Sequence, residues 1–88
     1  MNNALPWVVY ILRCSDDSFY TGITNNLDRR LLEHNDTSQQ TKAAKYTRAR
    51  QPVKLVYQEY AENRSHASRR EYQIKQLSRT QKIQLIKS

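Results

Sequence analysis

One short segment near the start of the chain constrains the fold more than any other. Residues Trp7–Leu12 read Trp-Val-Val-Tyr-Ile-Leu, a run of strand-favouring side chains that is apolar at both alternating sets of positions. Because successive side chains of a strand point to opposite faces, this strand needs apolar cover on both sides. The segment therefore predicts the central strand of a sheet that is covered on both faces.

Two other segments supply partner strands. A polar turn cluster at residues 15–18 separates the first strand from a second β-rich run, Phe19–Thr24, and this spacing predicts a hairpin. A third strand is expected over Val53–Tyr60. Alternation along this strand places three residues on one face: Val53, Leu55 and Tyr57.

Helices are expected to cover the sheet. Three segments are expected to be helical: Leu27–His34, His66–Leu77 and Thr80–Ile86. The pair Asn25-Asn26 offers a cap for the first helix, and Ser65 is expected to cap the second. Ser78 with Gln81 matches a capping box for the third. The sequence thus predicts an α+β fold with the element order β-β-α-β-α-α.

Length and composition exclude several classes of protein. The chain has 88 residues, which predicts a single domain over residues 1–88. Its one glycine, Gly22, excludes the phosphate-binding loops that need several glycines. Its one cysteine, Cys14, excludes internal disulfides and cysteine-based zinc sites and is typical of a reducing compartment. No segment reads as a membrane span or a signal peptide, so we expect a cytoplasmic protein without a membrane partner.

The positive charge is concentrated in two stretches without acids. The chain carries 15 Lys and Arg against 8 Asp and Glu, which gives a net charge of +7. One stretch lies between Thr37 and Gln58, and the other follows Glu71. Such stretches predict a polyanionic partner, of which nucleic acid is the commonest for a basic domain. The first stretch includes a long connection, in which one helical turn is expected over Thr41–Tyr46.

The expected helices carry two groups of residues that could do chemistry. Arg30 and His34 lie one turn apart and could grip a phosphate, although an exposed polar face is the simpler interpretation of this pair alone. Glu71 lies at the edge of an apolar stripe, where a carboxylate needs a partner. That partner is either Lys75, one turn further on, or a hard divalent cation such as Mg²⁺.

The expected hairpin carries a second group. Tyr10 and Tyr20 lie on its two strands, and a buried phenol needs a hydrogen-bond partner, although packing at the core edge is the simpler interpretation. Gly22 lies inside the second strand, where a glycine often marks a bulge or the close approach of a ligand or another backbone segment. A strand-end glycine without a function fits this position equally well.

Taken in chain order, these residues resemble the GIY-YIG nuclease domain, a family that includes the N-terminal incision domain of the UvrC excision-repair protein. The resemblance extends from about Trp7 to Ile86 and is closest to the small stand-alone bacterial members. It implies a three-stranded antiparallel sheet flanked by helices. It also implies a metal-dependent endonuclease that acts on nucleic acid, with DNA in repair or structure processing as the expected substrate. The matching segments are Val8-Val9-Tyr10, Tyr20-Thr21-Gly22, Asn26-Leu27-Asp28-Arg29-Arg30 with His34, and Glu71.

The resemblance also implies roles for individual residues. The implied catalytic residues and metal ligand are Tyr10, Tyr20, Arg30 and His34, with Glu71 holding Mg²⁺ or Mn²⁺. Three cations are implied to bind the phosphates of a flanking duplex: Lys45, Arg48 and Arg50. The family arginine that counters the charge on the phosphate matches Arg30, with Arg29 as the weaker match. Tyr10, alone or with Tyr20 or His34, would orient and deprotonate the attacking water. That last role calls for a phenol pKa below its usual value of about 10, and nearby cations are one way to lower it.

The chain departs from the family pattern in three ways. Its first motif reads Val-Val-Tyr instead of Gly-Ile-Tyr, and its second reads Tyr-Thr-Gly. Family members often carry an asparagine beyond the metal-binding glutamate, whereas here no asparagine follows Asn63, so that role is unfilled or passes to Gln76 or Ser78. No DNA-binding domain is appended, so the choice of target is weak or depends on a protein partner.

Two other functions fit the basic composition. One is a nucleic-acid-binding module without catalytic activity, in which the last two helices imitate a helix-turn-helix around Ser78 and Arg79. The other is a small basic protein that docks on a larger protein or ribonucleoprotein.

Overall fold

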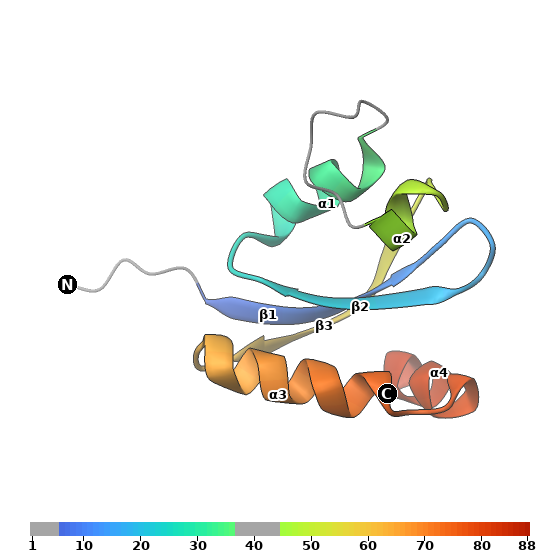
Figure 1. Cartoon of the computed structure of the whole chain (residues 1–88). Coiled ribbons are helices and arrows are strands. Elements are labelled where there is room, and N and C mark those ends of the chain that lie inside the picture. The colour runs from blue at the N-terminus through green and yellow to red at the C-terminus, as the bar shows by residue number, and fades with distance from the viewer. Residues whose placement is uncertain (1–5, 37–44) are drawn as a thin grey trace.

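The computed structural model describes residues 6–36 and 45–88, which form the predicted α+β fold (Figure 1). Its sheet is antiparallel, with the strands in the order β2-β1-β3. The strands are β1 (Trp7–Arg13), β2 (Phe19–Thr24) and β3 (Lys54–Ala61). As the sequence predicts, β1 is the central strand, and β1 and β2 form a hairpin.

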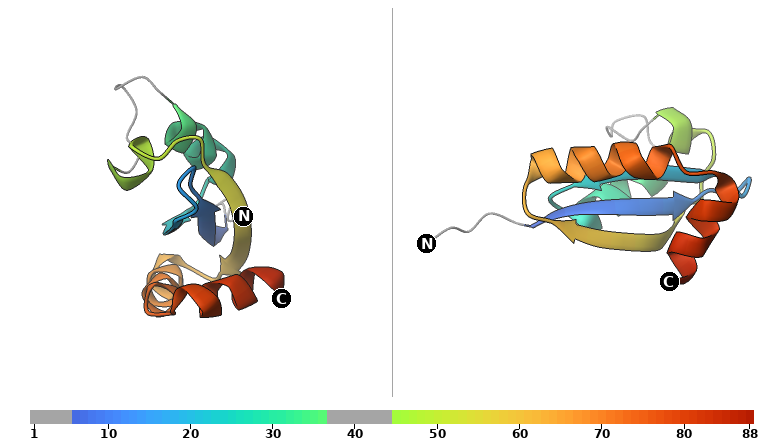
Figure 2. Two further views of the ribbon diagram at one scale, coloured as in Figure 1. Left: turned by 90° about the vertical axis from the view of Figure 1, so that its right-hand side faces the viewer. Right: turned by 90° about the horizontal axis from the view of Figure 1, so that it is seen from below.

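Helices cover both faces of this sheet (Figures 1 and 2). They are α1 (Leu27–Asn35), α2 (Lys45–Arg48), α3 (Arg64–Lys75) and α4 (Arg79–Lys87). Helices α1 and α2 lie on one face, and α3 and α4 lie on the other. The predicted element order is confirmed, and the single turn α2 lies in the long connection between α1 and β3. Of the helical turn expected over residues 41–46, residues 41–44 lie outside the described part of the chain.

The core has two halves, one on each side of β1. Val8, Tyr10 and Leu12 belong to the half that packs against α1. Val9 and Ile11 belong to the half that packs against α3, where Ala67 and Ile74 are fully buried. Since no β1 residue from Val8 to Leu12 is more than 5% exposed, the prediction of a strand covered on both faces is confirmed.

The predicted face of β3 is wrong at one residue. Leu55 packs against the α1 half of the core together with Val53, whereas Tyr57 packs against the α3 half. The cause is a register shift, because Ile11 pairs with Tyr57 and Leu12 pairs with Leu55. Val56 is thus an extra residue in β3, and such a β-bulge moves the following side chain to the other face.

Two of the three predicted helix caps are confirmed. Asn26 accepts a hydrogen bond from the backbone N–H of Arg29, and Ser78 forms the expected capping box with Gln81. The prediction that Ser65 caps α3 is wrong. Asn63 caps it instead, since its Oδ1 accepts a hydrogen bond from the backbone N–H of His66 at 2.9 Å and the helix begins at Arg64.

None of the helices in the described ranges is both long enough and apolar enough to cross a membrane. Cys14 is buried in the α1 half of the core and is a free thiol. Burial raises the pKa of this thiol above its usual value, so its role here is that of a small apolar side chain.

Candidate active site

Three rings from three different elements meet on the α1 face of the sheet. They belong to Tyr10 of β1, Tyr20 of β2 and His34 of α1. The ring centroids of Tyr20 and His34 are 5.2 Å apart, those of Tyr10 and His34 are 5.9 Å apart, and those of Tyr10 and Tyr20 are 6.4 Å apart. Strand register explains part of this arrangement, because Tyr10 pairs with Gly22 across the hairpin and Tyr20 lies two residues before Gly22 on the same face.

Gly22 leaves the space into which the phenol of Tyr10 extends. A Cβ atom at this position would lie 2.5 Å from the hydroxyl oxygen of Tyr10 and 2.7 Å from its Cζ atom. Its distance to Cε2 of Tyr20 would be 3.1 Å. Since Tyr10 is only 1% exposed, its ring has little room to give way. The group that approaches this glycine closely is thus a side chain, the phenol of Tyr10, and not the backbone or ligand that the sequence led us to expect.

The hydroxyl of Tyr10 belongs to a buried chain of hydrogen bonds. It lies 2.9 Å from Nε2 of His34, and Nδ1 of the same ring lies 2.7 Å from Oγ1 of Thr47 on α2. His34 and Thr47 are both fully buried. Sequence reasoning missed Thr47, although this residue lies within the range from Trp7 to Ile86 over which the resemblance extends. Thr47 thus joins α2 to the catalytic candidates.

Burial keeps both Tyr10 and His34 neutral at pH 7. Desolvation, reinforced by Tyr20, raises the pKa of Tyr10 to about 12, while hydrogen bonding and charge from Arg30 act in the opposite direction. The sequence-based expectation of a lowered phenol pKa is therefore wrong for the free protein. Desolvation, followed by the positive charge of Arg30, lowers the pKa of His34 to about 4. The neutral imidazole can then accept or donate a hydrogen bond at either side.

Arg30 lies beside this chain of hydrogen bonds. Its side chain is 23% exposed, and its Nη1 atom lies 3.0 Å from Oε1 of Glu33, one turn further along α1. Hydrogen bonds to Glu33 and to Tyr10 raise the pKa of Arg30 against the opposing effect of burial. The guanidinium is thus held next to the phenol, with part of its surface open to a ligand.

Glu71 comes from α3, on the other face of the sheet from the three rings. Its carboxylate lies 3.4 Å from Nζ of Lys75, so the ion pair that the sequence offered as one alternative is present. The Glu71 side chain is 24% exposed. Its negative charge also raises the pKa of Tyr10, although it is the smallest of the causes. The carboxylate and the phenol therefore interact electrostatically across the sheet.

The carboxylate of Glu71 is the kind of ligand that hard divalent cations prefer. Within the described residues, no group of three or more His, Cys, Asp or Glu side chains could hold a metal ion. Mg²⁺ is often held by one or two carboxylates, with water and substrate phosphate as the remaining ligands. Glu71 fits that pattern as a single, partly exposed carboxylate, and Mn²⁺ accepts the same oxygen ligands.

The three cations expected to bind phosphate differ in their surroundings. Lys45 and Arg48 are exposed on α2. The guanidinium of Arg50 lies 3.8 Å above the ring of Tyr46, and its Nε atom lies 3.0 Å from Oδ2 of Asp16. Arg50 thus ties α2 to the turn between β1 and β2.

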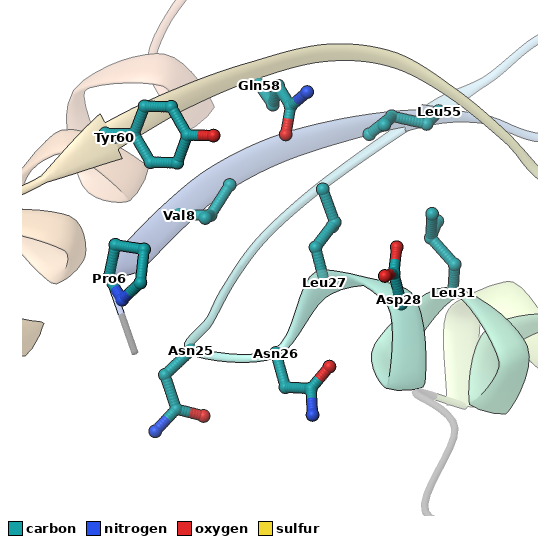
Figure 3. Close-up of a pocket in the computed structure, with 10 residues that line it drawn as sticks. All are labelled: Pro6, Val8, Asn25, Asn26, Leu27, Asp28, Leu31, Leu55, Gln58 and Tyr60. Carbon is teal, nitrogen blue, oxygen red and sulfur yellow. The ribbon is translucent and has the colours of Figure 1, made fainter. Parts of the chain in front are cut away.

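A separate hollow lies between α1 and β3 (Figure 3). Its lining does not include the cluster formed by Tyr10, Tyr20 and His34. Its volume is about 380 Å³, and apolar side chains such as Leu27, Leu31 and Leu55 line it. Asp28 is the one charged residue in its lining. A hollow with a carboxylate and no cation does not suit a phosphate group, so we place the candidate active site at the cluster instead.

The buried imidazole of His34 predicts a specific dependence of stability on pH. In the unfolded chain this histidine takes up a proton near pH 6.5, whereas in the folded protein its pKa is about 4. The unfolded state thus binds more protons between these values, so the free energy of unfolding falls as the pH falls. We expect a loss of about 2 kcal/mol between pH 7 and pH 5 in urea titrations.

A histidine-to-glutamine change at the other histidine serves as the control for this measurement. His66 is exposed at the start of α3, so the His66→Gln variant is expected to keep the same pH dependence. If the free energy of unfolding of the wild-type protein did not change between pH 7 and pH 5, the assignment of His34 as a buried, neutral imidazole would be wrong.

Comparison with known proteins identifies several relatives of this chain. Residues 6–84 match the family model described as the GIY-YIG catalytic domain. A UPF0213 protein of Clostridium perfringens is 58% identical over 80 residues, which cover 91% of this chain and 82% of that protein. A UPF0213 protein of Desulfotalea psychrophila is 55% identical over 82 residues, which cover 93% of this chain and 72% of that protein.

Two solution NMR structures have the same fold. A protein from E. faecalis is 39% identical and superposes with a TM-score of 0.64 over 99% of this chain and 88% of that one. A UPF0213 protein from Bacillus halodurans is 43% identical and superposes with a TM-score of 0.58 over 94% of this chain and 84% of that one.

Proposed function

The chain belongs to the GIY-YIG catalytic domain family, a family of nucleases, and from this premise we propose that it is a metal-dependent endonuclease that hydrolyses phosphodiester bonds in nucleic acid. The observation that carries the proposal is the buried pair formed by Tyr10 and His34, with Arg30 beside it. This pair supplies a place for a proton next to a fixed positive charge. Hydrolysis of a phosphodiester needs both.

In the proposed mechanism, Tyr10 passes a proton from the attacking water to His34. As the water oxygen bonds to phosphorus and the bond to the leaving sugar oxygen breaks, the hydroxyl of Tyr10 takes the water proton and gives its own to Nε2 of His34. The leaving oxygen takes a proton from solvent. This relay starts from the neutral groups that the raised pKa of Tyr10 and the lowered pKa of His34 provide. Because the lowered pKa of His34 also disfavours the imidazolium, His34 holds the proton only transiently and returns it through Tyr10 to solvent, which restores both neutral groups. It requires the tautomer in which Nδ1 of His34 donates to Thr47.

Arg30 and Tyr20 act on the phosphate in this mechanism. The guanidinium of Arg30 stabilises the negative charge that builds up on the phosphate oxygens, and its ion pair with Glu33 fixes its position. The ring of Tyr20 packs against His34 at 5.2 Å, and its hydroxyl is proposed to orient the water or the phosphate.

We propose that Glu71 is the protein ligand of Mg²⁺ or Mn²⁺. Such an ion polarises the scissile phosphate and stabilises the leaving oxygen when it is bound. Lys75 holds the Glu71 carboxylate from the side through the contact of 3.4 Å. The Glu71 side chain is partly exposed, which leaves it accessible to a cation from solvent.

We propose DNA in repair or structure processing as the substrate, and the cytoplasm as the location. Lys45, Arg48 and Arg50 are proposed to bind phosphates of the flanking duplex, with Arg50 acting from its fixed position beside Tyr46. A protein partner is also proposed to direct the enzyme to its target.

A nuclease assay with defined substrates tests the proposed function. Duplex, single-stranded, flap and junction DNA, with RNA counterparts, are incubated with the purified protein in Mg²⁺, in Mn²⁺ or in EDTA. We expect internal cleavage of at least one substrate in either metal and none in the chelator. Salt-sensitive binding without cleavage in any metal would favour the non-catalytic binding module, and cleavage that survives EDTA would remove the metal from the proposal.

A further inference from the structure

Tyr10 lies on one face of the sheet and Glu71 lies on the other. The outer edge of β2 is the boundary between these two faces at the candidate active site. In the strand order β2-β1-β3, β2 pairs with β1 on one side only. When the molecule is viewed along the strands, this edge lies between α1 and α2 on one side and α3 on the other (Figure 2, left). A ligand that reaches both Tyr10 and Glu71 therefore has to approach this edge.

A basic hollow lies at one end of this edge. Its volume is about 340 Å³, and it is lined by the end of β2 together with residues of α1 and α3. Three of its lining residues are arginines: Arg29, Arg30 and Arg64. The one carboxylate in the lining, Glu33, is paired with Arg30. The guanidinium of Arg64 lies 5.8 Å from the ring of Trp7, so an aromatic face and a cation are available together.

A second basic hollow lies at the other end of the edge. Its volume is about 270 Å³, and its lining includes Lys75 of α3, Lys82 of α4 and Tyr46 of α2. Lys75 is paired with Glu71, while Tyr46 is 38% exposed and stacks on Tyr20 with a centroid distance of 6.1 Å. This hollow thus also joins cations to an aromatic ring, next to a catalytic candidate.

The candidate catalytic centre lies between the two hollows. Along β2, one hollow ends at Thr21 and the other begins at Ile23, which leaves Gly22 and the phenol of Tyr10 in the middle. Along α3, Arg64 belongs to the first hollow, Lys75 belongs to the second, and Glu71 lies between them.

The separation of the two hollows suits a polynucleotide. Eleven steps of about 1.5 Å along α3 put roughly 16 Å between Arg64 and Lys75. One strand of B-form DNA advances about 3.4 Å along the helix axis for each phosphate, so roughly 16 Å measured along that axis corresponds to about five nucleotides. Two cationic hollows at this spacing, with the reacting groups between them, are arranged for an extended polyanion and not for a single phosphate.

We propose that a polynucleotide strand lies along the outer edge of β2, with its phosphates on one side of the cleaved bond held by Arg29 and Arg64 and those on the other side held by Lys75 and Lys82. This inference rests on the proposed function and narrows its substrate class. The strand has to extend for several nucleotides on both sides of the cleaved bond. The four cations are additional to Lys45, Arg48 and Arg50.

The four cations Arg29, Arg64, Lys75 and Lys82 form the proposed binding track along β2. Salt-dependent binding tests this track directly. A fluorescein-labelled single-stranded DNA of 20 nucleotides is titrated with wild-type protein, Arg64→Gln or Lys82→Gln in EDTA over a range of salt concentrations, and anisotropy gives the dissociation constant. Each of the two variants is expected to reduce the slope of log Kd against log salt by about 0.7, because one phosphate contact is lost. The matched control is Lys54→Gln, which removes one exposed positive charge from β3 at the opposite edge of the sheet and is expected to keep the wild-type slope.

The outcomes separate this inference from the proposed function. Thermal unfolding shows whether each variant is folded, and cleavage by wild type in Mg²⁺ is measured in parallel. If the wild-type protein cleaves DNA while Arg64→Gln and Lys82→Gln keep the wild-type slope, the proposed binding track is wrong and the proposed nuclease activity is supported. If the slope of log Kd against log salt falls in both variants but the wild-type protein cleaves no substrate, the track is supported as a binding surface and the proposed nuclease activity is wrong. A slope lost equally in Lys54→Gln would overturn the track, because the binding would then depend on net charge and not on position.

Discussion

Gly22→Ala is expected to reduce the rate of cleavage about 100-fold, because the new methyl group displaces the phenol of Tyr10. Its Cβ atom would lie 2.5 Å from the hydroxyl of Tyr10, so the ring has to move by about an ångström, and misplacing a reacting group by that distance costs roughly 100-fold. The free energy of unfolding is expected to fall by about 1–3 kcal/mol, as for other additions of volume to a packed core. Single-turnover cleavage and urea titrations measure the two effects.

A second substitution identifies the cause of this loss of stability. In a Tyr10→Leu background the hydroxyl and Cζ atoms that crowd the new methyl group are absent. Gly22→Ala is then expected to be neutral or to stabilise by about 0.5–1 kcal/mol, which is the usual advantage of alanine over glycine in a strand. If the substitution cost the same in both backgrounds, the crowding by Tyr10 would not be the reason why this position needs glycine.

The sequence predicts those parts of the fold that depend on local pattern. The absence of a polar face over Trp7–Leu12 places β1 at the centre of the sheet, and the structure buries both of its faces. The spacing of Ser78 and Gln81 predicts the capping box that begins α4. In both cases the physical cause lies within one short segment, so the sequence of that segment contains it.

The sequence does not predict features that depend on pairing between distant segments. The bulge at Val56 is a property of the pairing between β3 and β1, and it moves Tyr57 to the other face. Asn63 and Ser65 are both good N-caps, and only the tertiary position of the chain decides between them. The hydrogen bond between His34 and Thr47 joins residues 13 positions apart across a connection whose path the sequence leaves open.

The environment of Tyr10 shows a different limit of prediction from sequence, since it concerns the pKa of a side chain and not its position. The role that the resemblance implies for Tyr10 calls for a lowered phenol pKa, and Arg30 does act in that direction. Burial outweighs it, and burial depends on how completely α1 and β2 cover the ring. The resemblance to the family named Tyr10 and Glu71 together. Their origin on opposite faces of the sheet, with the edge of β2 between them, becomes visible only in three dimensions.

Glu71→Gln is expected to reduce metal-dependent cleavage by about 100- to 1000-fold while leaving the fold intact. Loss of the proposed metal ligand removes about 3–4 kcal/mol of transition-state stabilisation, and each tenfold in rate corresponds to about 1.4 kcal/mol. The amide keeps the shape of the side chain. What the fold loses is a partly exposed ion pair with Lys75, which contributes at most about 1 kcal/mol. Initial rates across a Mg²⁺ titration, together with urea unfolding, measure both quantities.

The matched control is Glu62→Gln, which makes the same chemical change at an exposed carboxylate before α3 and is expected to cleave like wild type. The Mg²⁺ titration also separates a metal ligand from a residue that acts only through Lys75. If Glu71 binds the ion, the variant needs a higher Mg²⁺ concentration for half-maximal rate, whereas a purely structural role lowers the maximal rate at an unchanged midpoint. Wild-type rates in Glu71→Gln would remove this carboxylate from the mechanism.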